Sequence, residues 1–379
     1  MKPIQMVDLQ GQYAKIKTQV DAEMQQVIND ASFIRGPQVA AFAKDLEQYL
    51  DVKHVIPCGN GTDALQIALM ALDLKPGDEV IGPDFTFVAT VEVAGLLGFK
   101  PVLVDVDMDT FCIDIEAVKK AITSKTKAIV PVHLFGQCAN MDAIMEIAEA
   151  HNLFVVEDNA QAIGANYYAK DGSTKKAGTI GHLGTSSFFP SKNLGCYGDG
   201  GAVFTNDDAL AQKCKEIVNH GMGAQYNYVR LGVNSRLDTL QAAILKCKLP
   251  HLDSYSEARM KVADYYDKAF SGSKNLKTPV RARYSNHVFH QYTLVSCDID
   301  RKALVDYMAR KGIPVKVYYP KALHSFIPYM DAARDEKDFK NTNVLCNAVI
   351  SLPIHTEMEE EQLKYITSNL LAFLEKNET

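Results

Sequence analysis

Lys192 lies at one of four points in this 379-residue chain where the residue types could support chemistry. It follows an aromatic-proline run, residues 188–190, and precedes a glycine-rich stretch, residues 195–201. A lysine at the partly desolvated end of a strand has a lowered pKa, and its neutral amine is then a better nucleophile. The competing interpretation is an ordinary loop lysine that lies in solvent.

Asp158 ends an apolar run, residues 153–156, that is typical of a buried strand. A carboxylate at this point loses hydration and needs a cationic or hydrogen-bonding partner. The protonated ring nitrogen of a cofactor would be such a partner. The alternative is that Asp158 caps a helical turn beginning near Ala160.

Residues 59–64, Gly-Asn-Gly-Thr-Asp-Ala, lie between a predicted strand and a predicted helix. Free N–H groups and the positive end of the helix dipole favour a phosphate at such a position. The run also fits the G-x-G-x-x-A pattern of dinucleotide-binding folds, with Asp84 about 20 residues further on as a ribose contact. A third possibility is a tight turn with Thr62 as the N-cap.

Residues 232–238 form a fourth segment, in which Asn234, Arg236 and Asp238 lead into a helical pattern. Arg236 could make a bidentate contact with a substrate carboxylate. A capped helix with an arginine on its surface would explain the same residues.

The elements that must position these residues alternate between short β-branched runs and helical patterns from about residue 53 to 206. Continuous apolar runs flanked by helices are typical of a mostly parallel sheet covered on both faces, so this half is predicted to be α/β. Ligands bind beyond the carboxyl ends of such strands, where Asp158 falls. The predicted strands are 54–58, 79–81, 101–105, 127–132, 153–158, 185–189 and 202–205.

The C-terminal part is predicted to be a smaller α+β domain. Pro250 interrupts a long helical pattern over 236–270, and strands are expected at 288–298 and 313–319, with helices near 301–311 and 358–375. We therefore predict a large domain over 1–250 and a small domain over 251–379. The first 35 residues are predicted to be helical and belong clearly to neither. Polar loops around 166–180 and 222–230 are expected to shape substrate choice.

The composition excludes several classes of function. Hydrophobic residues make up 47% of the chain, and 40 basic against 46 acidic side chains give a net charge of −6. The sequence has no long basic run, so we expect no nucleic-acid partner. No stretch approaches the ~20 apolar residues that span a bilayer, so we expect a cytoplasmic protein without a membrane partner. The scattered cysteines and histidines, with one H-x-x-H at His287 and His290, predict no metal site.

In combination, Asp158, Lys192 and an upstream phosphate-binding turn are the parts that pyridoxal 5′-phosphate (PLP) needs. They supply a partner for the pyridine nitrogen, an amine for the aldehyde and a cradle for the phosphate. The glycine turn and Asp84 alone would also suit an NAD-dependent sugar oxidoreductase. Such an enzyme has no use for Lys192.

Several motifs resemble those of the PLP-dependent nucleotide-sugar aminotransferases of the DegT/DnrJ/StrS type. The resemblance runs in order and spacing from about residue 5 to 370, and it implies an aspartate-aminotransferase-like fold (fold type I). It also implies a homodimer with active sites at the subunit interface. The motifs are GNGTDAL at 59–65, EDNAQ at 157–161, SFFPSKNLG at 187–195, GDGGA at 198–202 and NSRLD at 234–238.

The resemblance implies a role for each matching residue. Lys192 would bind the cofactor and then act as general base and acid, and Asp158 would hold the pyridine nitrogen. Gln161 would hydrogen-bond the ring oxygen, and Phe85 would stack on the ring face. The residues expected to hold the phosphate are Gly61, Thr62 and Ser187, with Asn234 reaching it from the other subunit.

The implied reaction moves an amino group from L-glutamate, released as 2-oxoglutarate, to a nucleotide-linked keto sugar for cell-surface polysaccharide such as lipopolysaccharide O-antigen. The most similar branch acts on UDP-2-acetamido-2-deoxy-3-keto-glucuronate, and there Arg236, Tyr318 and Tyr319 would lie near the acidic end of the substrate. That branch has histidine where this chain has Tyr318. A neutral 3-keto or 4-keto sugar on UDP or dTDP is therefore an alternative, and a non-catalytic regulatory relative is another.

Overall fold

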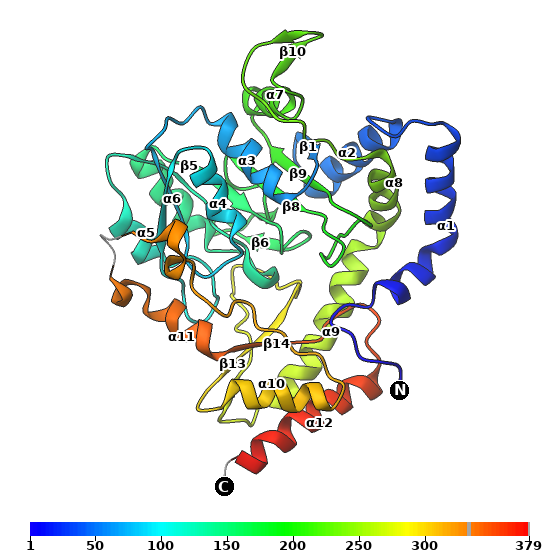
Figure 1. Cartoon of the computed structure of the whole chain (residues 1–379), viewed down its shortest axis with the longest axis vertical. Helices are drawn as coiled ribbons and strands as arrows, with labels where there is room; N and C mark the ends of the chain where they lie inside the picture. Colours follow the sequence, from blue (N-terminus) through cyan, green and yellow to red (C-terminus); the bar gives the residue numbers. More distant parts are fainter. Residues whose placement is uncertain (332–334, 378–379) are drawn as a thin grey trace.

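A seven-stranded sheet with the strand order β1-β9-β8-β5-β4-β2-β3 forms the centre of the computed structural model, which describes residues 1–331 and 335–377 (Figure 1). The strands from β8 to β3 are parallel, whereas β9 runs antiparallel to both β1 and β8. The mostly parallel sheet that the sequence predicts is therefore confirmed. Its strands are β1 (His54–Cys58), β2 (Glu79–Pro83), β3 (Lys100–Val104), β4 (Thr126–Ile129), β5 (Phe154–Asp158), β8 (Leu183–Ser187) and β9 (Gly201–Thr205).

Helices cover both faces of this sheet because successive strand residues point to opposite sides. Val80 and Val156 pack with α3, α4 and α7, whereas their neighbours Ile81 and Val155 pack with α5 and α6. Near β1 and β9 the second face is covered by α2 and α8. These helices are α2 (Pro37–Leu50), α3 (Gly61–Ala71), α4 (Ala89–Leu96), α5 (Ile115–Ala121), α6 (Met141–His151), α7 (Asp208–Ile217) and α8 (Thr239–Lys248).

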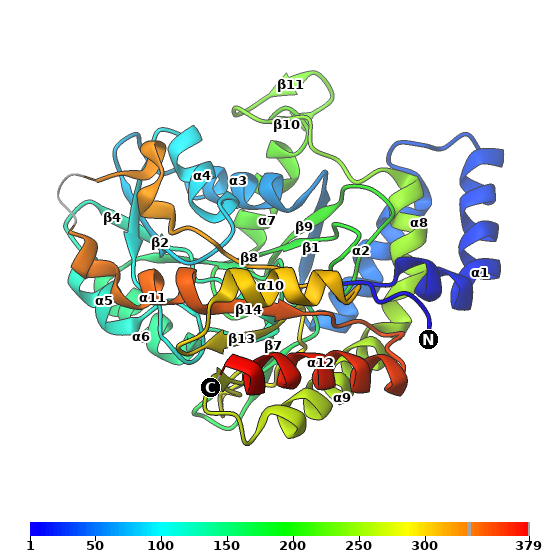
Figure 2. The same ribbon diagram turned by 60° about the horizontal axis from the view of Figure 1, so that its bottom comes forward.

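Pro250 breaks the long helical pattern as predicted, because a short 3₁₀ turn, Leu249–His251, separates α8 from α9 (Leu252–Phe270). Beyond α9 lies a second, antiparallel sheet in the order β12-β13-β14. Figure 2 shows α9, α10 and α12 beside it. The elements are β12 (Leu276–Lys277), β13 (Tyr292–Ser296), α10 (Arg301–Arg310), α11 (Lys340–Ala348), β14 (Val349–Leu352) and α12 (Glu360–Asn377).

The predicted strand at 313–319 is wrong. Only Lys316 pairs there, in an isolated bridge to Ser351. Pro314 has no N–H to donate to a ladder. The consecutive side chains of Val317, Tyr318 and Tyr319 all pack against the same core instead of alternating across a strand. The sequence pattern also gave no indication of α11.

The N-terminal segment contacts both parts of the molecule. Helix α1 (Leu9–Asn29) packs on α8 through Ile16 and Val20, while Ile4 packs against the core around the small sheet. The loops at 166–180 and 222–230 contain short hairpins, β6 (Asn166–Tyr168) with β7 (Thr174–Lys176), and β10 (Met222–Ala224) with β11 (Asn227–Tyr228). The second hairpin projects from the body (Figures 1 and 2). Within the described ranges, no helix combines the length and apolar character needed to cross a membrane.

Candidate active site

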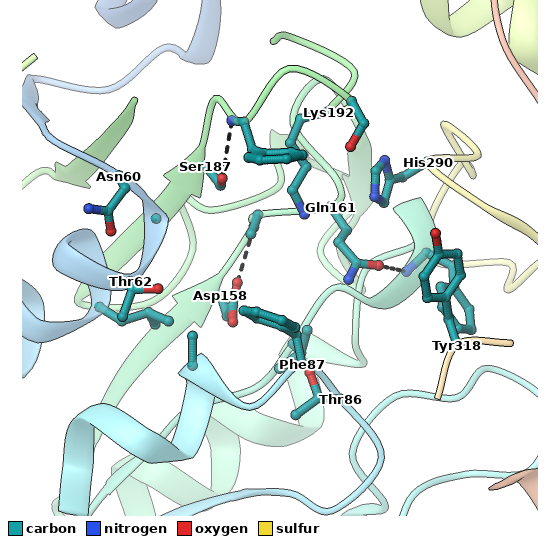
Figure 3. Close-up of a pocket in the computed structure, with 18 of the residues that line it drawn as sticks. Asn60, Thr62, Thr86, Phe87, Asp158, Gln161, Ser187, Lys192, His290 and Tyr318 are labelled. Atoms are coloured by element: carbon teal, nitrogen blue, oxygen red, sulfur yellow. Dashed lines mark hydrogen bonds between the residues drawn. The ribbon is translucent and has the colours of Figure 1, made fainter. Parts of the chain in front are cut away.

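A cavity of about 460 Å³ lies at the edge of the large sheet where β1, β5 and β8 end (Figure 3). It collects most of the residues singled out in the sequence. Those that line it are Gly61, Thr62, Asp158, Gln161, Ser187, Lys192, Tyr318 and Tyr319.

Lys192 lies at the tip of a closed turn after β8. The backbone N–H of Cys196 donates to the carbonyl of Phe188 at 2.8 Å and so closes the turn at its base. A Cβ at Gly195 would come within 2.3 Å of the Pro190 carbonyl oxygen, so only glycine fits there. Burial lowers the pKa of Lys192 to about 8, although the carboxylate of Asp158 acts in the opposite direction. Lys192 is therefore a desolvated amine and not a solvent-exposed loop lysine.

Asp158 ends β5 and is only 5% exposed. Its carboxylate accepts hydrogen bonds from the Thr90 hydroxyl at 2.8 Å and from the backbone N–H of Ala160 at 3.1 Å. Residues 160–164 form a turn and not the helix of the capping alternative. No lysine, arginine or histidine of the described residues forms an ion pair with this carboxylate, so the cavity can offer it to a cationic ligand group.

The glycine turn lies against the end of β8. Asn60, and not Thr62, caps α3, because its side-chain oxygen accepts from the backbone N–H of Asp63 at 2.8 Å. A Cβ at Gly61 would lie 2.6 Å from the Cβ of Ser187, so the glycine allows the helix N-terminus to approach the strand end. The result is a small cradle of free N–H groups and hydroxyls, of the kind that binds phosphate.

Gln161 connects the cavity to its far wall. Its side-chain oxygen accepts from the backbone N–H of Phe135 at 2.8 Å, and its amide nitrogen donates to the hydroxyl of Tyr319 at 3.1 Å. These bonds fix the orientation of the amide and leave one N–H for a ligand. Burial raises the pKa of Tyr319, so its hydroxyl stays protonated.

Phe85 does not line the cavity. It is 1% exposed and packs against the rings of Phe111, Phe135 and Tyr319. Phe87, which is 55% exposed, lines the cavity in its place (Figure 3). The aromatic side chain of this loop that can cover a ligand ring is therefore Phe87, a residue that the sequence argument missed.

Two further predicted residues lie away from the cavity of their own chain. Asn234 is exposed on the surface, and Arg236 lines a separate hollow with Arg35 and Lys215. Ser235 between them connects this segment to the glycine turn, because its hydroxyl donates to Asp63 at 2.6 Å and accepts from the Gly59 N–H at 2.9 Å.

Asp84, the ribose contact of the dinucleotide alternative, is also unavailable to a ligand. Its carboxylate is buried and bonded to the ring and the backbone N–H of His324 at 2.6 Å and 2.7 Å. His290, by contrast, lines the cavity. The sequence does not indicate this position, because the H-x-x-H pattern suggests only a metal ligand. Its partner in that pattern, His287, does not line the cavity and stacks on Phe289 at 3.8 Å between ring centroids.

Comparison with known proteins agrees with this geometry. The aminotransferase for UDP-2-acetamido-2-deoxy-3-oxo-D-glucuronate of Pseudomonas aeruginosa is 43% identical over 97% of this chain and 99% of its own length. A pleiotropic regulatory protein of Geobacillus stearothermophilus is also 43% identical, over 98% of both chains. The UDP-N-acetyl-3-dehydro-α-D-glucosamine 3-aminotransferase of Acidithiobacillus ferrooxidans is 40% identical over 96% of both.

A solved structure supports the same relationship. The crystal structure of a DegT DnrJ EryC1 StrS aminotransferase from Brucella abortus has a TM-score of 0.93 and 39% identity, over 98% of this chain and 99% of the other. The sequence model of one family matches residues 14–371, nearly the whole chain. The protein belongs to the DegT/DnrJ/EryC1/StrS aminotransferase family.

Proposed function

We propose that this protein is a PLP-dependent aminotransferase that moves an amino group from L-glutamate to a nucleotide-linked 3-keto sugar. The observation that carries the proposal is a desolvated amine, Lys192, in one cavity with the carboxylate of Asp158 and the N-terminus of α3. Among the described residues, this carboxylate has hydrogen-bond donors but no ion-pair partner.

The residues present fit PLP. Asp158 offers its carboxylate to the ring nitrogen, and Phe87 offers an aromatic face to the ring. Gly61, Thr62 and Ser187 form a cradle suited to the phosphate. When bound, PLP accepts the electron pair released as the Cα–H bond of an amino acid breaks.

The protein supplies the proton transfer and the orientation. Because the pKa of Lys192 is about 8, part of its amine is neutral near pH 8. The neutral amine can take a proton from the substrate Cα and deliver it to the cofactor carbon C4′. Asp158 is held in place by Thr90, and Gln161 by Phe135 and Tyr319. These fixed groups require little reorganisation during the reaction.

For the sugar substrate, we propose UDP-2-acetamido-2-deoxy-3-keto-glucuronate. The relatives from P. aeruginosa and A. ferrooxidans are both named for UDP-linked sugars with a 3-oxo or 3-dehydro group, which supports the 3-keto position. Among the described residues that line the cavity, Lys192 is the only lysine or arginine. A uronate carboxylate would therefore need a cation from elsewhere, for which Arg236 of a second copy is our candidate. A neutral 3-keto or 4-keto sugar is the alternative.

The same proposal includes a homodimer in the cytoplasm and a product used in lipopolysaccharide O-antigen. Asn234 and Arg236 are the residues expected to reach the other subunit's site. Their position on the surface, away from their own cavity, supports this role.

Spectroscopy and product analysis test the function. Purified protein given PLP should develop the visible absorption of a lysine-bound cofactor, and glutamate should shift that band. Lys192→Ala should abolish both changes; an unchanged band in this variant would mean that another lysine binds the cofactor. Mass spectrometry of products from UDP- and dTDP-keto sugars then identifies the acceptor. Cofactor binding without turnover of any acceptor would favour a regulatory role instead.

A further inference from the structure

His290 is a buried polar side chain in the cavity wall that has no role in the scheme above. It is 6% exposed, and its ring nitrogens form no hydrogen bond with another residue that the structure describes. Of the two nitrogens, Nδ1 is inaccessible to solvent. Because Nδ1 is enclosed, a ligand in the cavity can reach the ring only through Nε2. A buried polar side chain that bonds to no neighbouring residue is rare in proteins. Figure 3 shows its ring beside Lys192 at the edge of the cavity.

The backbone around His290 is fixed relative to Lys192. Asn193, the residue after Lys192, donates its side-chain N–H to the Val288 carbonyl at 3.0 Å. The backbone N–H groups of Val288 and Gln291 donate to residues 136 and 135 at 2.8 Å and 3.2 Å. The ring therefore occupies a set position next to the amine.

The intervening Phe289 has a φ of 47°, which is unusual for a bulky residue. This left-handed conformation lets Val288 and Phe289 pack into different cores while His290 faces the cavity. Backbone strain of this kind is concentrated at functional sites.

The charge state of His290 follows from its surroundings. Burial, the ammonium of Lys192 and the guanidinium of Arg259 all hold the pKa of His290 well below its ordinary value. Arg259 itself is anchored nearby, since it donates to the carbonyls of Phe289 and His290 at 3.2 Å and 3.4 Å. His290 is therefore a neutral imidazole that offers one N–H donor and one acceptor.

We propose that His290 binds both substrates in turn by hydrogen-bonding the group next to the reacting carbon. This inference rests on the proposed function. Lys192 must reach the reacting carbon, so its neighbour His290 lies beside the substituents of that carbon. In the amino donor that substituent is a carboxylate, and in the sugar it is a hydroxyl or an acetamido group.

A neutral group suits this double task better than a cation. A fixed positive charge would bind the carboxylates of glutamate and 2-oxoglutarate strongly and would gain little from a sugar hydroxyl. A neutral imidazole can donate to a carboxylate in one half of the reaction and to a sugar oxygen in the other.

The experiment uses the PLP-loaded protein and two unreactive probes, glutarate for the amino donor and UDP-N-acetylglucosamine for the sugar. Calorimetry measures the Kd of each probe for the wild type, His290→Phe and His290→Gln. His287→Gln is the control, because His287 is also buried but does not line the cavity. His287 Nδ1 accepts the Phe289 N–H at 3.0 Å, and glutamine keeps an acceptor for this bond. Covalent PLP uptake is recorded for every variant from its absorption band.

His290→Phe should weaken binding of both probes about 10-fold, the loss expected when one hydrogen bond to the ligand is removed. His290→Gln should recover most of this loss, and His287→Gln should leave both Kd values unchanged. Unchanged binding in His290→Phe, weakening of one probe only, or an equal effect of His287→Gln would overturn the inference. The proposed function is judged separately, by PLP uptake and turnover of the wild type.

Discussion

The properties of Lys192 are set by its immediate surroundings more than by its residue type. Burial lowers its pKa to about 8, and the nearby carboxylate of Asp158 prevents a larger change. The sequence could predict this direction, because a lysine after an aromatic strand end is expected to be desolvated. It could not predict the balance with Asp158, which depends on the pairing of β5 with β8.

The lowered pKa makes a prediction for pH dependence. The neutral amine reacts with an aldehyde, so the rate of covalent PLP uptake by the protein should rise with pH through about 8 and level off above it. A surface lysine would give a rate that still rises at pH 10. Stopped-flow absorbance over roughly two pH units on either side of 8, with Lys192→Ala as the blank, measures this profile. A rate that continues to climb to the end of this range would contradict the assigned desolvation.

Phe85 and Phe87 show where the sequence is insufficient at this scale. Both belong to the loop after β2, and composition gives no reason to prefer one of them as the ring-stacking residue. The structure separates them by burial, since one fills the core between the two sheets and the other is open to the cavity.

Their alanine variants should therefore fail in different ways. Phe85→Ala should lower the free energy of unfolding by about 3 to 5 kcal/mol, the usual loss for a buried phenylalanine. Phe87→Ala should leave unfolding nearly unchanged and weaken the retention of PLP. Denaturant unfolding and dialysis against cofactor-free buffer measure the two effects. A stable Phe85→Ala protein that loses PLP would restore Phe85 as the stacking residue.

Among the elements, those of the large sheet could be read from sequence because each strand is a short apolar run between helices. The segment 313–319 could not, since its apolar residues alternate as in a strand although Tyr318 and Tyr319 serve the cavity wall. A local sequence pattern does not show that Tyr318 and Tyr319 form part of a cavity whose other residues lie far away in the chain. For the turn that carries Lys192, the sequence predicts only a glycine-rich connection and does not indicate which element holds the turn in place.

That element is α8, whose Lys248 is 1% exposed and donates to the Gly195 carbonyl at 2.7 Å. Its ammonium also lies 4.7 Å from the ring centre of Tyr197. Lys248→Met should leave the carbonyl without a partner, at a cost of about 1 to 3 kcal/mol in the free energy of unfolding. The loosened turn should also slow covalent PLP uptake by Lys192.

The control for this prediction is Lys246→Met, on the same helix but half-exposed, with only a 3.8 Å ion pair to Glu23. It should change neither quantity by a measurable amount. Unfolding curves and PLP uptake rates for both variants decide the matter. Equal behaviour of the two variants would show that α8 does not position the turn.

For the whole molecule, the division into domains at residue 250 stays a prediction. Several hydrogen bonds cross this boundary. His324 bonds to Asp84 at 2.6 Å, and the backbone N–H of Asn341 donates to Asp105 at 2.8 Å. Near the N-terminus, Met6 accepts from the Ile354 N–H at 3.3 Å. Sequence patterns could not indicate these contacts. Each contact joins residues far apart in the chain, and no recognisable motif contains both partners.

The scale of the assembly provides the last prediction, which concerns Asn234 and Arg236. If each active site takes Lys192 from one chain and Asn234 from the other, Lys192→Ala and Asn234→Ala should each inactivate the homodimer. A mixed dimer of these two chains has one site with both substitutions and one site with neither. Random reassortment of equal amounts should thus restore about a quarter of the wild-type activity, because a two-fold dimer has two equivalent sites.

Arg236→Ala mixed with Lys192→Ala extends the test to the sugar carboxylate. Recovery with the 3-keto-glucuronate substrate would support Arg236 of the partner as its cation, and an Arg236→Ala homodimer should keep its activity on the neutral 3-keto sugar. The control mixes Lys192→Ala with Asp158→Ala, because both residues line the cavity of the same chain. Each site of that mixed dimer carries one of the two substitutions, so no activity should return. Recovery in that control together with none in the Asn234 mixture would contradict the shared site.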